Sequence, residues 1–205
     1  MPATRTRPRT QPPVLAEAEA GSAAQRERRK RILDATLALA SQGGYDAVQM
    51  RAVAERADVA LGTLYRYFPS KIHLLVCALT EELEQLQDKL DRRPIPGNTP
   101  ADRMLHVLSR VTRSMQRDPL LTEAMTRAFM FADPSAAAEV NVVARLMERM
   151  LTKAMHDGEP SADDMAIARV IGDVLLSNLV AWVTRRASAN DVSNHLELAA
   201  RLLLR

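Results

Sequence analysis

The sequence predicts an all-α fold of about nine helices. Of its 205 residues, 47% are hydrophobic and 26% are charged, whereas only seven are glycine and 3% are aromatic. Runs of β-branched or aromatic residues are scarce, and apolar residues recur at the three- and four-residue spacing of an amphipathic helix. A chain of this length can bury a substantial core. We therefore expect a globular helical protein, built as one large domain or two small ones.

The first 21 residues are expected to form a flexible arm. They hold four of the eleven prolines and few apolar residues that could be buried. Basic charge gathers at this end, since residues 1–31 contain eight Lys or Arg and only three Glu. Such a segment suits a polyanionic partner, either nucleic acid or an anionic membrane surface, although a solvated helix start could have the same composition.

Ordered structure is expected to begin at Ser22. The sequence SAAQ from Ser22 to Gln25 has the form of a capping box, in which both end side chains satisfy free amides of the first helical turn. An apolar stripe at helical spacing follows over residues 32–40. Gly43 and Gly44 then end this first helix.

The next two helices are short and are separated by a tight turn. The buried face of the first is formed by Met50, Val53, Ala54 and Ala57. Residues 58–60 break this helix, and the second runs from Leu61 to Phe68 before Pro69 stops it. These two helices and the first form a small N-terminal unit.

A longer fourth helix is expected to join this unit to the rest of the chain. Ser70 is placed to cap it, and it can run from Lys71 to about Arg92. Residues 94–98 form a loop by composition. The remaining helices are expected at about 99–117, 119–131, 135–156, 162–187 and 190–204.

Two short helices joined by a tight turn form a helix-turn-helix, whose second helix enters the DNA major groove. The segment from Gln49 to Lys71, QMRAVAERADVALGTLYRYFPSK, resembles the TetR family of bacterial repressors. The resemblance implies a helix-turn-helix DNA-binding domain at residues 22–69 and a larger helical ligand-binding and dimerisation domain at 70–205. It also implies a homodimer that binds a palindromic, double-stranded DNA operator.

The resemblance assigns roles within this segment, position by position. It implies that base edges are faced by Arg51, Leu61, Gly62 and Tyr65, and that phosphates are held by Thr63, Tyr67 and Lys71. Arg51 can donate two hydrogen bonds to guanine, Leu61 can touch a thymine methyl group, and Gly62 allows close backbone approach. Leu61 could equally belong to the core, because it lies on the same helix face as Leu64 and Phe68.

Two residues depart from the family pattern. Gln49 stands where a Thr usually caps the helix, and because Gln is a poorer cap it could contact DNA instead. Asp58 stands where the turn commonly has Gly, and Asp tolerates a left-handed backbone better than most residues. In the arm, Arg5, Arg7 and Arg9 could lie in the adjacent minor groove or could add only non-specific attraction.

The last two expected helices are apolar on more than one side, which predicts that a partner subunit covers them. TetR-like proteins pair these helices with their copies in a four-helix bundle. The expected dimer interface comprises Ile171, Val174, Leu175, Leu198 and Leu202. An ordinary monomer core is the alternative explanation for these apolar residues.

The chain has ten methionines, and seven of them lie in the middle helices. Methionine is flexible and adapts to bulky apolar guests, although core filling is the usual explanation for such a group. We expect a ligand pocket lined by Met104, Leu108, Met115, Met125, Phe129, Met130, Met147 and Trp182.

From about Ser22 to Leu203 the chain also resembles the actinobacterial TetR-like repressors of cholesterol catabolism. The segments MQRDPLLTEAMTRAFMFADPSAAAEV and LLSNLVAWVTRRAS carry this resemblance. It implies release from operators by a steroid-derived acyl-CoA thioester, with Arg113, Arg117 and Arg127 as candidates for binding the CoA phosphates. A fatty acyl-CoA sensor, a cationic-drug sensor and a DNA binder without an inducer remain alternatives.

We expect no enzyme, no metal site and no cofactor. The four histidines and one cysteine form no nucleophile–base pattern, and His73 and Cys77 alone would make a weak metal site. A single cysteine cannot form an internal disulfide. The sequence contains no run of about 18 apolar residues, so we expect no membrane span. Because the opening residues lack the apolar stretch of a secretory signal, we expect a cytoplasmic protein.

Overall fold

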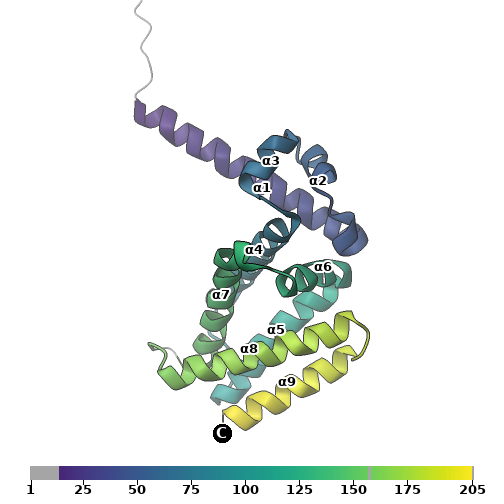
Figure 1. Ribbon diagram of the computed structural model, residues 1–205. Helices are drawn as coiled ribbons and strands as arrows, with labels where there is room; N and C mark the ends of the chain where they lie inside the picture. Colours follow the sequence, from purple (N-terminus) through teal and green to yellow (C-terminus); the bar gives the residue numbers. More distant parts are fainter. Residues whose placement is uncertain (1–13, 157, 205) are drawn as a thin grey trace, which may run out of the picture.

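The computed structural model describes residues 14–156 and 158–204, which form helices and loops without a strand (Figure 1). In chain order these elements are α1 (Val14–Ala47), α2 (Met50–Arg56), α3 (Leu61–Tyr67), α4 (Lys71–Asp91), α5 (Pro100–Arg117), α6 (Pro119–Met130), the 3-10 helix η1 (Pro134–Ala136), α7 (Ala137–Met155), α8 (Ala162–Val183) and α9 (Ala189–Leu203). The expected all-α fold is therefore confirmed.

Helix α1 begins earlier than the sequence suggested. It is helical from Val14, so Ser22 lies within the helix and is not its cap, and residues 14–21 belong to the helix and not to the expected flexible arm. The reason lies in the Ala, Glu and Leu residues of the segment 14–20, because these residue types favour the helix and let it continue. The arm residues Arg5, Arg7 and Arg9 lie outside the described part of the chain.

Gly43 and Gly44 interrupt the helical backbone near the end of α1, as expected. Gly43 has φ −153° and ψ 21°, and Gly44 has φ +67° and ψ −158°. A positive φ of this size costs glycine little and other residues more, which explains the glycine at position 44. The chain then makes one more helical turn, which ends at Ala47, before α2 begins.

Helices α2 and α3 pack on α1 around a small core. Val53 and Leu64 are fully buried there together with Ile32 of α1, and Phe68 is 2% exposed. The turn between the two helices places Asp58 at φ +52°, the left-handed conformation expected at this position. The residues predicted to form the inner face of the motif therefore do so.

Helix α4 leads from this motif into the second domain. Its cap is the expected one, since the Ser70 hydroxyl accepts a hydrogen bond from the backbone N–H of His73 at 3.4 Å. The His73 ring is buried, with Nδ1 2.9 Å from the Ser70 hydroxyl, and its Nε2 donates to the carbonyl oxygen of Ser135 at 3.0 Å. Buried side chains then run along α4 from Leu74 to Leu90.

Helices α5 to α9 enclose the second part of the core, with α8 and α9 side by side at the end remote from the helix-turn-helix (Figure 1). Helix α8 stops at Val183, whereas the sequence suggested residue 187. The backbone turns there because Arg185 adopts φ +59° and the N–H of Arg186 donates to the carbonyl oxygen of Ala181 at 2.7 Å. This left-handed closure is a common way to end a helix.

Three helices of the second domain begin with a capping box that uses Asp. The pairs are Thr99 with Asp102, Ser161 with Asp164, and Ser188 with Asp191. Hydrogen bonds from Ser161 lower the pKa of Asp164 to about 2, and the ring of His156, 2.8 Å from the carboxylate, adds to the effect. Hydrogen bonds from the capping residue also lower the pKa of Asp102 and of Asp191.

We predict that the free energy of unfolding decreases as the pH falls from about 4 to about 2. A carboxylate with a depressed folded-state pKa stabilises the fold above its unfolded pKa and loses that effect on protonation. In urea unfolding across this pH range, Asp164→Asn should show a flatter dependence than the unchanged protein. Asp163→Asn, which alters a carboxylate of the same turn without a capping role, is the matched control. Equal slopes for the two variants would contradict the prediction.

Candidate nucleic-acid interface and effector cavity

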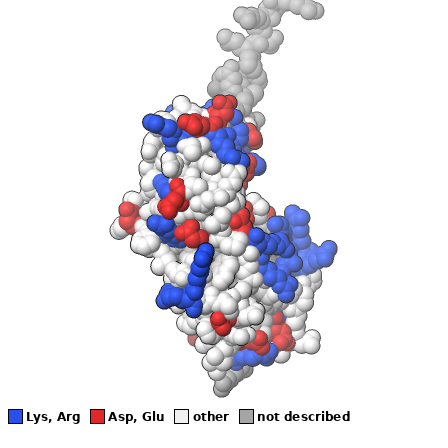
Figure 2. Space-filling model, turned by 90° about the vertical axis from the view of Figure 1, so that its right-hand side faces the viewer, with Lys and Arg blue, Asp and Glu red and all other residues white. Residues whose placement is uncertain are grey.

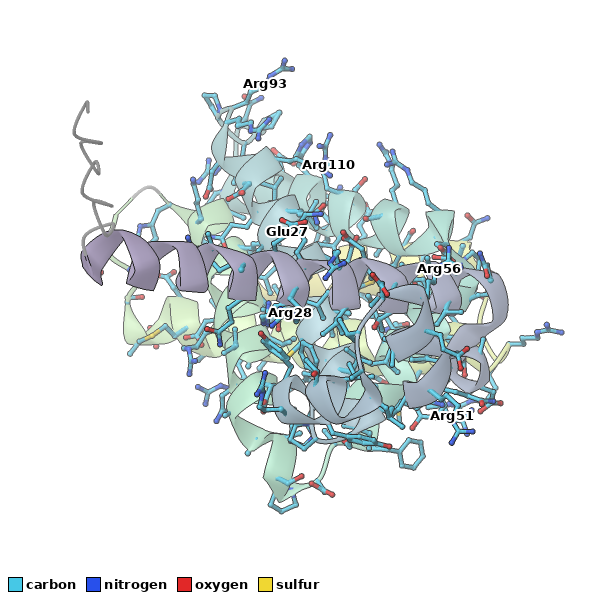
Figure 3. The ribbon with its side chains drawn as sticks, turned by 90° about the horizontal axis from the view of Figure 1, so that it is seen from above. Glu27, Arg28, Arg51, Arg56, Arg93 and Arg110 are labelled. Carbon is cyan, nitrogen blue, oxygen red and sulfur yellow. The ribbon has the colours of Figure 1, made fainter. Side chains whose placement is uncertain are left out.

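The outer face of α2 and α3 carries most of the predicted DNA contacts. Gln49 and Arg51 are exposed, and Tyr65 exposes 47% of its surface, whereas Thr63 and Tyr67 are half-buried. The Gln49 side chain makes no capping hydrogen bond, so its amide group is available to another molecule. Figure 3 looks onto this end of the molecule and shows Arg51 at the outer edge of the domain.

Gly62 lies in the first turn of α3, where the fold does not require a glycine. A Cβ atom added there would meet no atom within 4 Å, and the residue has no positive φ. Glycine within a helix costs roughly 0.5–1 kcal/mol relative to alanine. Close approach of a second molecule would explain why an open, exposed helix position carries glycine.

Leu61 lies at the edge of this face. It is half-buried and packs against the hydrophobic core, whereas Leu64 and Phe68 on the same helix are buried within it. The core role considered as an alternative therefore accounts for part of its surface, and the remainder is open at the start of α3.

A hollow of about 480 Å³ that the sequence did not predict lies between α1 and α3. Its lining includes Arg28 of α1 and Arg66 and Tyr67 of α3. The basic run at the start of α1 was the available signal, but only the packing of α1 beside α3 brings Arg28 close to Tyr67. These residues extend the candidate interface beyond the helix-turn-helix itself.

Lys71, a predicted phosphate contact, takes part in a cluster that joins the two domains. Its Nζ lies 4.0 Å from the centre of the Tyr45 ring, and Cζ of Arg127 lies 4.4 Å from the same centre. Burial lowers the pKa of Lys71. The backbone N–H of Tyr45 donates to the Glu123 carboxylate at 3.0 Å, and Arg127 pairs with Glu123 at 3.8 Å and with Asp46 at 3.6 Å. We call these five residues the Tyr45 cluster.

The Tyr45 cluster fixes the end of α1 against α6. Gly44 allows the close approach, because a Cβ atom at this residue would lie 2.9 Å from the carboxylate oxygen of Glu123. Arg127 was a candidate for binding CoA phosphates, and its two ion pairs and its place over Tyr45 engage it here instead. Arg113 and Arg117 are exposed on α5, outside the cavity described next.

An apolar cavity lies among α4, α6, α7 and α8. Its volume is about 190 Å³, and its walls include Leu79 and Leu83 of α4, Phe129 of α6, Met147 of α7 and Leu175 of α8. Polar groups enter only from α6, α7 and α8, through Thr126, Glu148, Arg169 and Asp173. The charged groups on α7 and α8 were not foreseen, because nothing in their sequence context marks them as facing inward.

The predicted pocket residues divide into three groups. Met115, Phe129 and Met147 line the cavity, and Met125 lines a smaller hollow beside it. Met104 and Leu108 lie instead in the core, because α5 packs against α7 and α9. Met130 is 48% exposed at the end of α6, and Trp182 is half-buried outside the cavity lining. Side-chain type alone did not separate core from cavity.

The predicted dimer residues also separate by helix face. Ile171 and Leu175 are buried inside the protomer, which corrects their assignment to the interface, and Val174 is half-buried. Leu198 and Leu202 of α9 are 58% and 51% exposed. The outward apolar surface of these helices further includes Met165, Val170 and Leu203. Helix α8 is also long and apolar enough to cross a membrane, a weak criterion that core helices of globular proteins also meet.

Two family profiles match the chain. Residues 32–76 match the profile described as "Bacterial regulatory proteins, tetR family", and residues 97–203 match "Tetracyclin repressor-like, C-terminal domain". Together these profiles cover the helix-turn-helix and helices α5 to α9, but not α4 beyond residue 76.

Curated relatives match nearly the whole chain. The HTH-type transcriptional repressor KstR of Rhodococcus jostii is 68% identical over 191 residues, which cover 93% of this chain and 89% of that protein. KstR of Mycolicibacterium smegmatis is 66% identical over 191 residues, with 93% and 94% of the two chains covered.

Solved structures share the fold. A TetR transcriptional regulator from Rhodococcus sp. RHA1 has a TM-score of 0.82 and 31% identity, with 88% of this chain and 97% of that chain covered. The Thermus thermophilus repressor FadR, in complex with lauroyl-CoA, has a TM-score of 0.67, 22% identity and coverages of 86% and 93%. On the profiles and the extended identity to KstR repressors, the chain belongs to the TetR family of bacterial transcriptional regulators.

Proposed function

We propose that this TetR-family repressor binds palindromic operator DNA as a homodimer and is released when a steroid-derived acyl-CoA occupies its cavity. The observation that carries the proposal is that α4 and α6 line the apolar cavity and also pack against α1 of the DNA-binding domain. A ligand between these helices can therefore change how the helix-turn-helix is held. Such a regulator acts by binding in the cytoplasm, where the chromosome lies, and not by catalysis.

The DNA contacts follow from the exposed face of α2 and α3. Arg51 and Tyr65 would meet base edges, with Gly62 admitting the close approach, while Thr63 and Tyr67 would hold the phosphates on either side. Lys71 would place a positive charge near the DNA backbone while its side chain stays in contact with the Tyr45 ring. The exposed Gln49 would extend the contacts at the start of α2.

The apolar outer surface of α8 and α9 supports dimerisation. Exposed Leu198 and Leu202 lie on the helix next to α8, whose exposed side carries Met165 and Val170. Contact between two copies would remove this apolar surface from water. A symmetric dimer would then present two α3 helices about 34–36 Å apart, one turn of DNA.

The cavity chemistry supports an apolar effector. Its volume of about 190 Å³ is below the roughly 300–1,000 Å³ of ordinary small-molecule sites. A sterol-sized guest would thus have to displace lining side chains, and the flexible Met115 and Met147 are suited to this. A fatty acyl-CoA is the second candidate, favoured by the lauroyl-CoA complex of the fold neighbour FadR.

Release requires that the effector bind the DNA-incompetent arrangement more tightly than the DNA-bound one. Widening of the cavity would push α4 and α6 apart. The shift of α4 would reach the DNA-binding domain through Ser70 and His73 at the start of that helix. The shift of α6 would reach it through the Tyr45 cluster. The spacing of the two α3 helices would then no longer match the operator.

We predict that Arg51→Ala weakens operator binding by about 1–3 kcal/mol and relaxes the preference for one guanine. Thr63→Ala should weaken binding to all sequences similarly, because a phosphate contact carries no base information. Binding of both variants to the operator and to single-base variants of it, measured by fluorescence anisotropy, checks the two roles. Equal, sequence-independent losses would show that the roles are assigned wrongly.

The proposed dimer surface can be tested by introducing negative charges into it. Leu198→Glu combined with Leu202→Glu should convert dimers to monomers in sedimentation equilibrium, because carboxylates would be forced into an apolar contact. Leu120→Glu is the control, since Leu120 is 46% exposed on α6, away from this surface. A dimer that survives the double substitution with its helix content intact would refute the proposed interface.

The effector is tested by titrating the protein–operator complex with cholestenoyl-CoA and with palmitoyl-CoA. Release at lower concentrations of cholestenoyl-CoA is the expected result, because the bulky steroid rings would widen the cavity between α4 and α6 more than a thin acyl chain. Preferential release by palmitoyl-CoA would favour the second candidate. Release by neither compound would remove the support for an acyl-CoA effector.

A further inference from the structure

A further hollow, of about 370 Å³, which we call the basic hollow, lies at the far end of α4 from the helix-turn-helix. Its charged lining residues are all basic: Lys89, Arg92 and Arg93 at the end of α4, and Arg110 on α5. His106 of α5 also lines it. Arg93 and Arg110 project on the same side of the molecule in Figure 3, and Figure 2 shows an edge where basic side chains gather with few acidic ones.

None of these cations forms an ion pair in the part of the chain that the structure describes, although Lys89 and the Glu82 carboxylate attract each other electrostatically. No Asp or Glu lines the hollow, and Asp91, at the end of α4, pairs with Lys153. The negative end of the α4 dipole favours cations at its last turn, which explains part of the charge there. It does not explain Arg110, which comes from the middle of α5 and faces the same hollow.

The basic hollow lies far from the predicted DNA-binding face of α3. Lys71 and Lys89 lie on one helix, 18 residues apart, which corresponds to about 27 Å at 1.5 Å per residue. The hollow therefore needs an anionic partner other than the operator held by the helix-turn-helix.

A narrow hollow of about 50 Å³, which we call the passage, lies between the basic hollow and the apolar cavity. It is bounded by α4, α5 and α6, where Leu86 is one helical turn from Leu90 of the basic hollow and Ser114 is one turn from Arg110. At its other end it shares Leu79, Leu83 and Met115 with the apolar cavity. The apolar cavity and the passage thus flank the same turns of α4, and the basic hollow lies one turn beyond the passage.

Most of the passage lining is apolar, but four polar residues also face it. Glu82 of α4 faces it, with Ser114 and Asp118 at α5 and Thr122 of α6. Burial raises the pKa of Glu82. Such a lining repels phosphate but can accept hydrogen bonds from the N–H groups of neutral amides. From Lys89 to Leu79 the passage extends about 15 Å along the helix.

We propose that the basic hollow binds the phosphate groups of the effector, whose neutral amide-bearing linker occupies the passage and whose apolar part occupies the cavity. A CoA thioester has these three parts in this order. The inference rests on the proposed function for the apolar part of the ligand. It moves the expected phosphate contacts from Arg113, Arg117 and Arg127 to Arg93 and Arg110, with Lys89 and Arg92 beside them.

The test is calorimetric titration of the full-length protein with free CoA and with palmitoyl-CoA. The variant Arg93→Gln/Arg110→Gln removes both charges and leaves polar, shorter amide side chains in their place. It should bind both ligands at least about tenfold more weakly, as expected for lost charge-assisted hydrogen bonds. The control Arg145→Gln/Arg149→Gln removes two exposed charges from α7, outside the hollow, and should bind like the unchanged protein.

Failure of this inference can be told apart from failure of the proposed function. Equal affinity of the two double variants for free CoA, or no binding of CoA by the unchanged protein, would overturn the phosphate site. Binding of CoA that is lost only in Arg93→Gln/Arg110→Gln, without operator release by any acyl-CoA, would support the site and refute the proposed effector. ATP binding as tight as that of CoA would overturn the role of the passage.

Discussion

The rest of the structure depends on α4, because this one rigid helix must pack against both domains at the same time. It packs against α1 of the DNA-binding domain and against α6 and α7 of the second domain, and its buried residues run from His73 to Leu90. Packed interiors resist gradual deformation, so one end of such a helix cannot shift without consequences at the other. The cap at Ser70 and the bond from His73 to Ser135 secure the end nearest the DNA.

The Tyr45 cluster gives the two domains a second connection, with a different chemistry. It combines cation–π contacts with ion pairs and a backbone hydrogen bond, all near the surface, where each is worth little alone. A contact of this kind can rearrange at lower cost than a buried apolar one. Helix α6 therefore couples the cavity wall at Thr126 and Phe129 to the end of α1 through a contact that can break and re-form.

The polar and apolar features of the second domain follow a gradient along α4. Its far end carries cations without ion pairs among the described residues, its middle faces a few carboxylates and hydroxyl groups among apolar side chains, and its nearer part faces methionine, leucine and phenylalanine. A ligand that is matched to this order has a charged head, a neutral polar linker and an apolar body. The dimer surface of α8 and α9 lies outside this path, so ligand binding and dimerisation use separate faces of α8.

The sequence by itself determined the helices, their order and the helix-turn-helix, because caps, prolines and three- to four-residue apolar spacing act locally. It also carried the family resemblance, through the residues from Gln49 to Lys71. It could not decide between core, cavity and surface for residues of one type: Met104 and Met115 lie on one helix, yet only Met115 meets the cavity. Nor could it pair Lys71 with Tyr45 or Arg93 with Arg110. These contacts join segments far apart in the chain, and only the tertiary packing of the helices brings them together.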